Sequence, residues 1–187
     1  MLLCVDIGNT QISLGLYATE LEEPGADSLE LVRPPLVAQW RMRTDPRMTA
    51  DELRVAINGM LGRHAKLVTG VAALSTVPLL LRELRLLAEQ LREQVHSVLV
   101  EPKVRTGVPV LVDNPKEVGS DRVVNTLAAF RLFGHACVVV DFGTSTNIDV
   151  VSPRGELLGA AIAPGIEISA DALAARAAAL TTVELAR

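Results

Sequence analysis

The chain has 187 residues, 49% of them hydrophobic and 3% aromatic, and a formal net charge of −4 at pH 7. This length and hydropathy allow one ordinary domain or two small ones with a core of Val, Leu, Ile and Ala. An acidic chain without a basic run is a poor match for a polyanion, so we expect no nucleic-acid partner. No window is long and apolar enough for a transmembrane helix, and the N-terminus lacks the features of a signal peptide, which favours a cytoplasmic protein with no membrane partner.

The first half of the chain predicts an α/β unit with a mixed sheet. Its predicted elements are strands 2–8, 11–17 and 36–43, a helix from 49 to about 64, a strand at 67–74, a helix at 79–94 and a strand at 97–100. Thr49 followed three residues later by Glu52 has the pattern of a capping box, which marks the helix start. The polar segment 22–35, with three prolines and a glycine, predicts an exposed loop.

The second half repeats the opening of the first. Its predicted elements are a helix at 118–133, strands 136–142, 145–152 and 155–163, and a helix at about 167–179. By the logic of the repeat, a strand, a helix and a strand are missing at the end, so we expect a truncated chain with an incomplete second unit. Cys4 and Cys137 each lie on the apolar run before a repeated turn, so we expect small buried core residues in a reducing compartment.

Each repeat contains an apolar run that ends in Asp-x-Gly, at Asp6 and at Asp141. The glycine lets the backbone approach an anion, the N–H groups and hydroxyls donate to it, and the aspartate can hold a cation. Two such hairpins can grip one nucleotide polyphosphate, so we expect the two carboxylates to face one another across a cleft. Pro164-Gly165 is interpreted either as a turn that brings a helix start against the nucleotide or as an ordinary loop-to-helix turn.

A duplicated α/β unit with Asp-x-Gly hairpins is the layout of the actin, Hsp70 and sugar-kinase superfamily, whose units are ribonuclease H-like. Five segments in order resemble motifs of type III pantothenate kinases, a family also described as Bvg accessory factors. They are Asp6 to Thr10, Trp40 to Asp45 with Ala50-Asp51-Glu52, Asn114 to Arg122 in a Pro-x-x-Val-Gly-x-Asp-Arg pattern, Val140 to Thr144, and Gly159 to Ile166. The resemblance covers the whole chain and predicts a first lobe at 1–101 and a second, truncated lobe at 102–187.

The resemblance implies ATP-dependent phosphorylation of pantothenate, the first committed step of coenzyme A synthesis, by a homodimer that needs Mg²⁺ and a monovalent cation (K⁺ or NH₄⁺). The nucleotide-binding residues that it implies are Asp6, Gly8, Asn9, Thr10, Gln11, Ser13 and Thr144. The implied pantothenate site is Gly119, Ser120, Asp121 and Arg122. Asp6 would hold the magnesium-phosphate end of ATP, and Asp141 would hold the monovalent cation.

Asp121 is the candidate catalytic base by the same resemblance. It would accept the proton of the pantothenate primary hydroxyl as that oxygen attacks the γ-phosphorus. Judged by its position alone, Asp121 is equally an acidic residue that is stabilised by the dipole at a helix N-terminus. Gly119 would let the backbone approach the substrate, and Arg122 could hold an anion such as the pantothenate carboxylate. The alternative for Arg122 is a solvated surface charge.

Two departures from the family pattern leave other functions open. Val112 stands where the family often carries a tyrosine, and Asn147 stands where the second phosphate motif usually has a threonine. The family also runs several dozen residues further. One alternative is a non-catalytic regulatory or accessory protein on the same fold, against which the intact charged residues of the motifs argue. The other is a superfamily kinase for a different small molecule, against which the Gly119 to Arg122 context argues.

Overall fold

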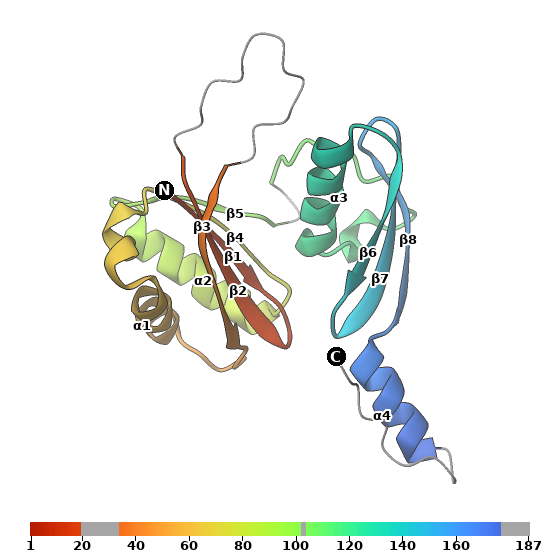
Figure 1. The fold of residues 1–187 in the computed structure, drawn as a ribbon, viewed down its shortest axis with the longest axis horizontal. Helices are drawn as coiled ribbons and strands as arrows, with labels where there is room; N and C mark the ends of the chain where they lie inside the picture. Colours follow the sequence, from red (N-terminus) through yellow and green to blue (C-terminus); the bar gives the residue numbers. More distant parts are fainter. Residues whose placement is uncertain (20–33, 102–103, 177–187) are drawn as a thin grey trace. The chain divides into compact units, whose positions relative to one another are not determined.

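The computed structural model describes residues 1–19, 34–101 and 104–176 (Figure 1). The chain forms two compact units, one of Met1–Thr106 with Val118–Asp121 and the other of Gly107–Glu117 with Arg122–Arg187. Most of the predicted loop 22–35 lies outside the described residues, and so do the last three residues predicted for the final helix. In the described part of the chain, no helix is long and apolar enough to cross a membrane.

The first unit is built on the mixed five-stranded sheet that the sequence predicts, in the order β3-β2-β1-β4-β5. Its strands are β1 (Leu2–Ile7), β2 (Gln11–Tyr17), β3 (Leu36–Arg43), β4 (Gly70–Ser75) and β5 (His96–Leu99). β1, β2 and β3 pair antiparallel, whereas β4 is parallel to both β1 and β5. The carboxyl ends of β1 and β4 therefore meet at one edge of the sheet, next to the Asp6 turn.

Two helices bury one face of this sheet, α1 (Ala50–Leu61) and α2 (Pro78–Leu91), which Figure 1 shows on the same side of it. Side chains alternate between the faces of a strand, so every second residue of β1 and β2 points at the helices. The buried set from these two strands is Leu3, Val5, Ile7, Ile12, Leu14 and Leu16. Burying each such side chain stabilises the fold by about 1.5–3 kcal/mol.

The capping box predicted at the start of α1 is confirmed. The Thr49 hydroxyl accepts the Glu52 N–H at 3.3 Å, and the Thr49 N–H donates to the Glu52 carboxylate at 2.8 Å. The helix ends at Leu61 rather than near residue 64, because Gly62 adopts a φ of +52°, in the left-handed region that favours glycine. A 3₁₀ turn, η1 (Gly62–Leu67), then leads to β4, which begins at Gly70 rather than at residue 67.

The second unit confirms the predicted repeat of the hairpin. After a short 3₁₀ turn, η2 (Pro115–Glu117), its elements are α3 (Ser120–Phe133), β6 (Cys137–Phe142), β7 (Ser145–Val151), β8 (Leu157–Pro164) and α4 (Ile166–Arg176). β6, β7 and β8 form an antiparallel sheet in chain order. Each element lies close to its predicted range, and the largest differences are at the starts of α3 and β8, each two residues later than predicted.

α3 packs on the second unit partly through a glycine in the β7–β8 turn. Gly155 has a φ of +79°, and a Cβ there would overlap the ring of Phe130 on α3. The expectation of buried cysteines is wrong, since Cys4 and Cys137 are both half-buried free thiols. Partial burial raises the pKa of the Cys4 thiol.

Candidate active site

The first Asp-x-Gly turn joins β1 to β2 and is fixed by the residue that follows β3. Within the turn, the Gly8 N–H donates to the Gln11 carbonyl at 3.0 Å. From the neighbouring strand, the Thr44 hydroxyl donates to the Gly8 carbonyl at 2.7 Å and the Thr44 N–H donates to the Thr10 carbonyl at 3.0 Å. Thr44 therefore orients the backbone of the turn from the side of β3.

Thr76, directly after β4, supports the turn from the other side. Its N–H and its hydroxyl both donate to the Ile7 carbonyl, at 2.9 and 3.3 Å. Ligands of open α/β sheets bind outside the carboxyl ends of the strands, which is where Thr76 lies. Sequence reasoning missed Thr76, although a hydroxyl residue after a strand parallel to β1 is a signal that could have found it.

A row of polar side chains crosses the sheet face that the helices leave open. Asp6 pairs in register with Ser13, and Ser13 pairs with Arg41, while Gln11 pairs with Arg43. Directly paired residues share a face, so both arginines lie on the Asp6 side of the sheet. Asp6, Gln11 and both arginines are exposed. The row offers cationic donors beside a carboxylate, which suits a polyphosphate carried with its metal. Neither arginine was among the predicted site residues.

The second Asp-x-Gly turn joins β6 to β7 and touches the start of α4. The Gly165 N–H donates to the Thr144 carbonyl at 3.1 Å, and the Ser169 N–H donates to the Gly165 carbonyl at 2.9 Å. A Cβ on Gly165 would overlap the carbonyl oxygens of Gly143 and Thr144. Only glycine allows this approach, so Gly165 brings a helix N-terminus, with its unpaired N–H groups, against the turn. That this helix start also lies against a nucleotide stays a prediction.

Asn147, which departs from the family pattern, lies directly opposite Asp141 in the β6–β7 register. Its side-chain oxygen accepts the Ser145 hydroxyl at 3.2 Å. Asp141 is half-buried and Thr144 is exposed at the tip. An amide at this position keeps a polar group beside the carboxylate on the same face of the hairpin, so the departure preserves the polar character of the turn.

The predicted substrate motif forms the entry to α3. Ser120 and Asp121 occupy the first turn of the helix, and both are half-buried. A Cβ on Gly119 would overlap the Asp121 carboxylate, so a glycine at this position avoids a steric clash with that carboxylate. The helix dipole stabilises a negative charge in this turn. Gly119 is therefore explained by its contact with Asp121, and the role of Asp121 as the catalytic base stays a prediction.

Arg122 is not a solvated surface charge. Its Nε and Nη2 atoms donate to Oδ1 of Asp149 on β7, at 2.8 and 2.5 Å. The Arg122 side chain is 9% exposed and the Asp149 side chain is 0% exposed. Sequence reasoning missed Asp149, because a lone acid on a strand has the same pattern as an outward-facing polar residue.

Each turn offers one carboxylate for a cation. Among the described residues, no group of three or more His, Cys, Asp or Glu side chains is placed to hold a metal. Mg²⁺ in nucleotide sites is usually bound by one or two carboxylates together with substrate phosphates and water. Asp6 fits that mode, in which the nucleotide brings most of the ligands. That Asp6 and Asp141 face one another across a cleft stays a prediction.

Comparison with solved structures concerns the fold alone. A crystal structure of the Ppx/GppA phosphatase of Aquifex aeolicus is 14% identical, with a TM-score of 0.50, and the match covers 92% of this chain and 55% of that one. Together with the repeated hairpin, this likeness supports the duplicated ribonuclease H-like α/β fold of the actin, Hsp70 and sugar-kinase superfamily.

Comparison with curated proteins extends over the whole chain. A type III pantothenate kinase of Saccharopolyspora erythraea is 64% identical over 187 residues, which are 100% of this chain and 68% of that protein. One of Rhodococcus erythropolis is 58% identical, with 100% and 65% covered. The chain thus spans about two thirds of the length of these relatives. The family model described as type III pantothenate kinase matches residues 2–187. The chain therefore belongs to the type III pantothenate kinase family.

Proposed function

We propose that this protein transfers the γ-phosphoryl group of ATP to the primary hydroxyl of pantothenate, forming 4'-phosphopantothenate for coenzyme A synthesis. The observation that carries the proposal is the entry to α3, where Gly119 leaves room for a half-buried Asp121 next to Arg122. This motif stands in a chain that matches the kinase family over residues 2–187. Phosphoryl transfer asks mainly for positioning and charge neutralisation, and one placed carboxylate is sufficient as a base.

The nucleotide would lie along the two Asp-x-Gly turns. In the first turn, the proposed contacts are Asp6, Gly8, Asn9, Thr10, Gln11 and Ser13, and in the second the proposed contact is Thr144. The rigid backbone that Thr44 and Thr76 give the first turn supports this assignment, because a fixed row of donors binds phosphate without reordering. Arg41 and Arg43 add positive charge on the same face.

Asp121 would take the hydroxyl proton of pantothenate while the new oxygen–phosphorus bond forms and the bond to the ADP oxygen breaks. Ser120, Gly119 and Arg122 would orient the substrate, with Arg122 directed to its carboxylate. Mg²⁺, when bound, neutralises the charge that develops on the β- and γ-phosphate oxygens. Asp6 would hold that ion, and Asp141 would hold a monovalent cation, K⁺ or NH₄⁺.

The proposal includes a cytoplasmic homodimer. An apolar face on the second sheet supports association, since Val138, Val140 and Phe142 are all exposed there.

The kinase assignment is tested in a polypeptide of the full length of the relatives. Wild-type protein should convert pantothenate and ATP to a phosphorylated product detected by mass spectrometry. Asp121→Asn should lower kcat by roughly 10²–10⁴-fold, which is the usual contribution of a general base, and should retain ATP binding. The matched control is Asp113→Asn, an exposed acid in the same segment, which should leave kcat unchanged. Wild-type protein that binds ATP but phosphorylates nothing would instead support the accessory-protein alternative.

A further inference from the structure

The Arg122–Asp149 pair is the most buried ion pair described in the structure, with side chains 9% and 0% exposed. Both of its hydrogen bonds end on a single oxygen, Oδ1 of Asp149. A guanidinium has five N–H donors in a planar fork. Anchoring the Nε and Nη2 atoms fixes the plane of that fork and directs the remaining Nη1 edge, so Asp149 sets where Arg122 can bind an anion.

The pair also joins two parts of the proposed site. Arg122 follows Asp121 in the first turn of α3, and Asp149 lies 27 residues further on, within β7. In the sheet, Asp149 is flanked by Val139 of β6 and Ala160 of β8, so it sits on the central strand. β7 begins at Ser145, directly after the second Asp-x-Gly turn. Asp149 therefore ties the substrate motif to the strand that carries the nucleotide turn.

Stability alone does not account for this pair. Removing two charges from water costs several kcal/mol per ion, and well-packed apolar residues in their place are often as stable or more stable. The second carboxylate oxygen, Asp149 Oδ2, is buried and has no hydrogen-bond partner among the described residues, and neither has the buried Thr126 hydroxyl one turn along α3. A pair kept for stability alone should have all its polar atoms hydrogen-bonded, so the unpartnered Oδ2 calls for another reason to keep the pair.

We propose that Asp149 is a positioning residue that holds the Arg122 guanidinium so that its free edge meets the carboxylate of the acceptor substrate. This inference rests on the proposed function, which gives the acceptor a hydroxyl that reacts and a carboxylate at its far end. Asp149 itself touches neither the nucleotide nor the acceptor. Asp149 orients the Arg122 guanidinium. Because Arg122 follows Asp121 in the first turn of α3, this orientation also determines where the acceptor hydroxyl lies relative to Asp121.

The test compares two acceptors in a polypeptide of full family length: pantothenate, and its alcohol analogue in which a hydroxyl replaces the carboxylate. Asp149→Asn keeps the size of the side chain and removes its charge. It should lower kcat/KM for pantothenate by on the order of 10²-fold, since small misplacements of a positioning group have effects of that size. The loss should appear mainly as a raised KM, and the alcohol analogue should lose less than about threefold, because it has no carboxylate for Arg122 to hold.

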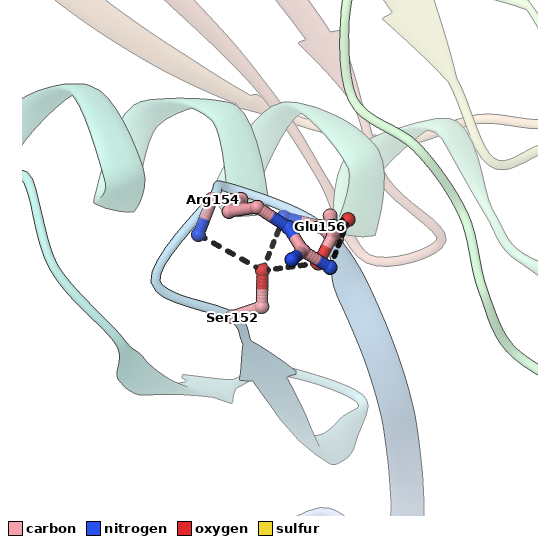
Figure 2. A network of polar contacts seen from close by, with 3 residues as sticks. All are labelled: Ser152, Arg154 and Glu156. Atoms are coloured by element: carbon pink, nitrogen blue, oxygen red, sulfur yellow. Dashed lines mark hydrogen bonds and ion pairs between the residues drawn. The ribbon is translucent and has the colours of Figure 1, made fainter.

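The matched control is the pair of Arg154 and Glu156 in the β7–β8 turn, in which the arginine is exposed and the glutamate is half-buried, and which Figure 2 shows with Ser152. Arg154 Nη2 lies 3.0 Å from Glu156 Oε1, and the Arg154 side chain is 80% exposed. Glu156→Gln removes a carboxylate from an arginine in the same unit, as Asp149→Asn does. It should leave kcat/KM unchanged for both acceptors.

Equal losses for both acceptors would show that Asp149 is only structural and would overturn the inference, and so would no loss for either. If Asp149→Asn does not fold by circular dichroism, Asp149→Glu carries the test, because it keeps the charge and displaces the guanidinium. A selective loss for pantothenate then supports the inference, and any other result overturns it. Wild-type protein that fails to phosphorylate pantothenate would overturn the proposed function and this inference with it, an outcome distinct from a failure of the variants alone.

Discussion

The two Asp-x-Gly hairpins carry equivalent apolar faces that are buried in one unit and exposed in the other. In β1, the inward-facing Leu3, Val5 and Ile7 are 3%, 4% and 0% exposed. With Asp6 aligned to Asp141, the matching residues of β6 are Val138, Val140 and Phe142, which are 58%, 47% and 67% exposed. The difference is the helical layer, because α1 and α2 cover the first face, whereas α3 contacts the opposite face of the second sheet through Asp149.

This comparison shows that an alternating strand pattern specifies which face is apolar, but not what covers it. The helix that follows β8, as α1 follows β3, leaves Ile166, Ile168 and Leu173 largely exposed. An apolar face of this kind favours association. The relatives, of which the chain spans about two thirds, are long enough to carry further covering elements.

The largest effect on stability is expected where α1 covers the first sheet. Leu53 is 0% exposed, so Leu53→Ala should destabilise the first unit by about 2–5 kcal/mol through lost burial and a cavity. Leu173→Ala on α4, which is 53% exposed, should change stability by less than about 0.5 kcal/mol. Trp40, the single tryptophan, lies on β3 against the first core, so its fluorescence in urea reports on that unit. Circular dichroism follows the Leu173 variant. Equal destabilisation by both variants would contradict the comparison.

Within the second unit, the close contact between Gly165 and the second Asp-x-Gly turn should be the most sensitive point. Gly165→Ala would place a methyl group on the Gly143 and Thr144 carbonyl oxygens, and overpacking of this kind costs about 1–3 kcal/mol. Gly159→Ala is the control, since a Cβ there meets no heavy atom within 4 Å. Thermal unfolding followed by far-UV circular dichroism would measure both. A Gly165 variant as stable as the Gly159 variant would show that the backbone of the turn can shift to accommodate the added methyl group.

The comparison of the two faces is tested directly at equivalent positions. Val5→Thr places a hydroxyl in the buried core and should cost about 1–3 kcal/mol, because the group is left without a partner. Val140→Thr should change stability by less than about 0.5 kcal/mol, since Val140 is 47% exposed. It should instead weaken self-association, measured by sedimentation at several concentrations. Unchanged association would mean that copies of the chain do not meet through this face.

The smallest expected effect is a pH dependence at the start of α1. The Thr49 N–H and hydroxyl hold the pKa of Glu52 below its usual value. The pKa of Glu52 is therefore lower in the folded state than in the unfolded state, where it is about 4.3. This carboxylate stabilises the fold fully above the unfolded pKa, and its contribution is lost as the pH falls through the folded pKa. Glu52→Gln keeps the capping geometry without the titration. The difference between wild type and variant in urea, followed by Trp40, should shrink below about pH 4. A difference independent of pH would argue against this cause.

Local sequence predicted most of the fold. The capping box at Thr49 and the two Asp-x-Gly turns are short-range patterns, and the structure forms each of them where it was expected. The end of α1 was missed, because the sequence does not reveal that Gly62 adopts a left-handed backbone conformation, which ends the helix at Leu61. The half-buried cysteines were missed for a related reason: Cys4 belongs to the strand face opposite the helices, and composition does not tell the two faces apart.

By itself, the sequence determined the order of the elements, the apolar faces of the hairpins and the residues of the motifs, because these depend on neighbours a few positions apart. Only the tertiary structure decided that Thr44 and Thr76 hold the first turn and that Arg122 is buried against Asp149. Those contacts join residues 27 to 69 positions apart, and their hydrogen bonds exist only when separate strands and helices meet. A carboxylate on a strand has the same sequence pattern whether it faces water or a buried guanidinium, and packing alone makes that choice.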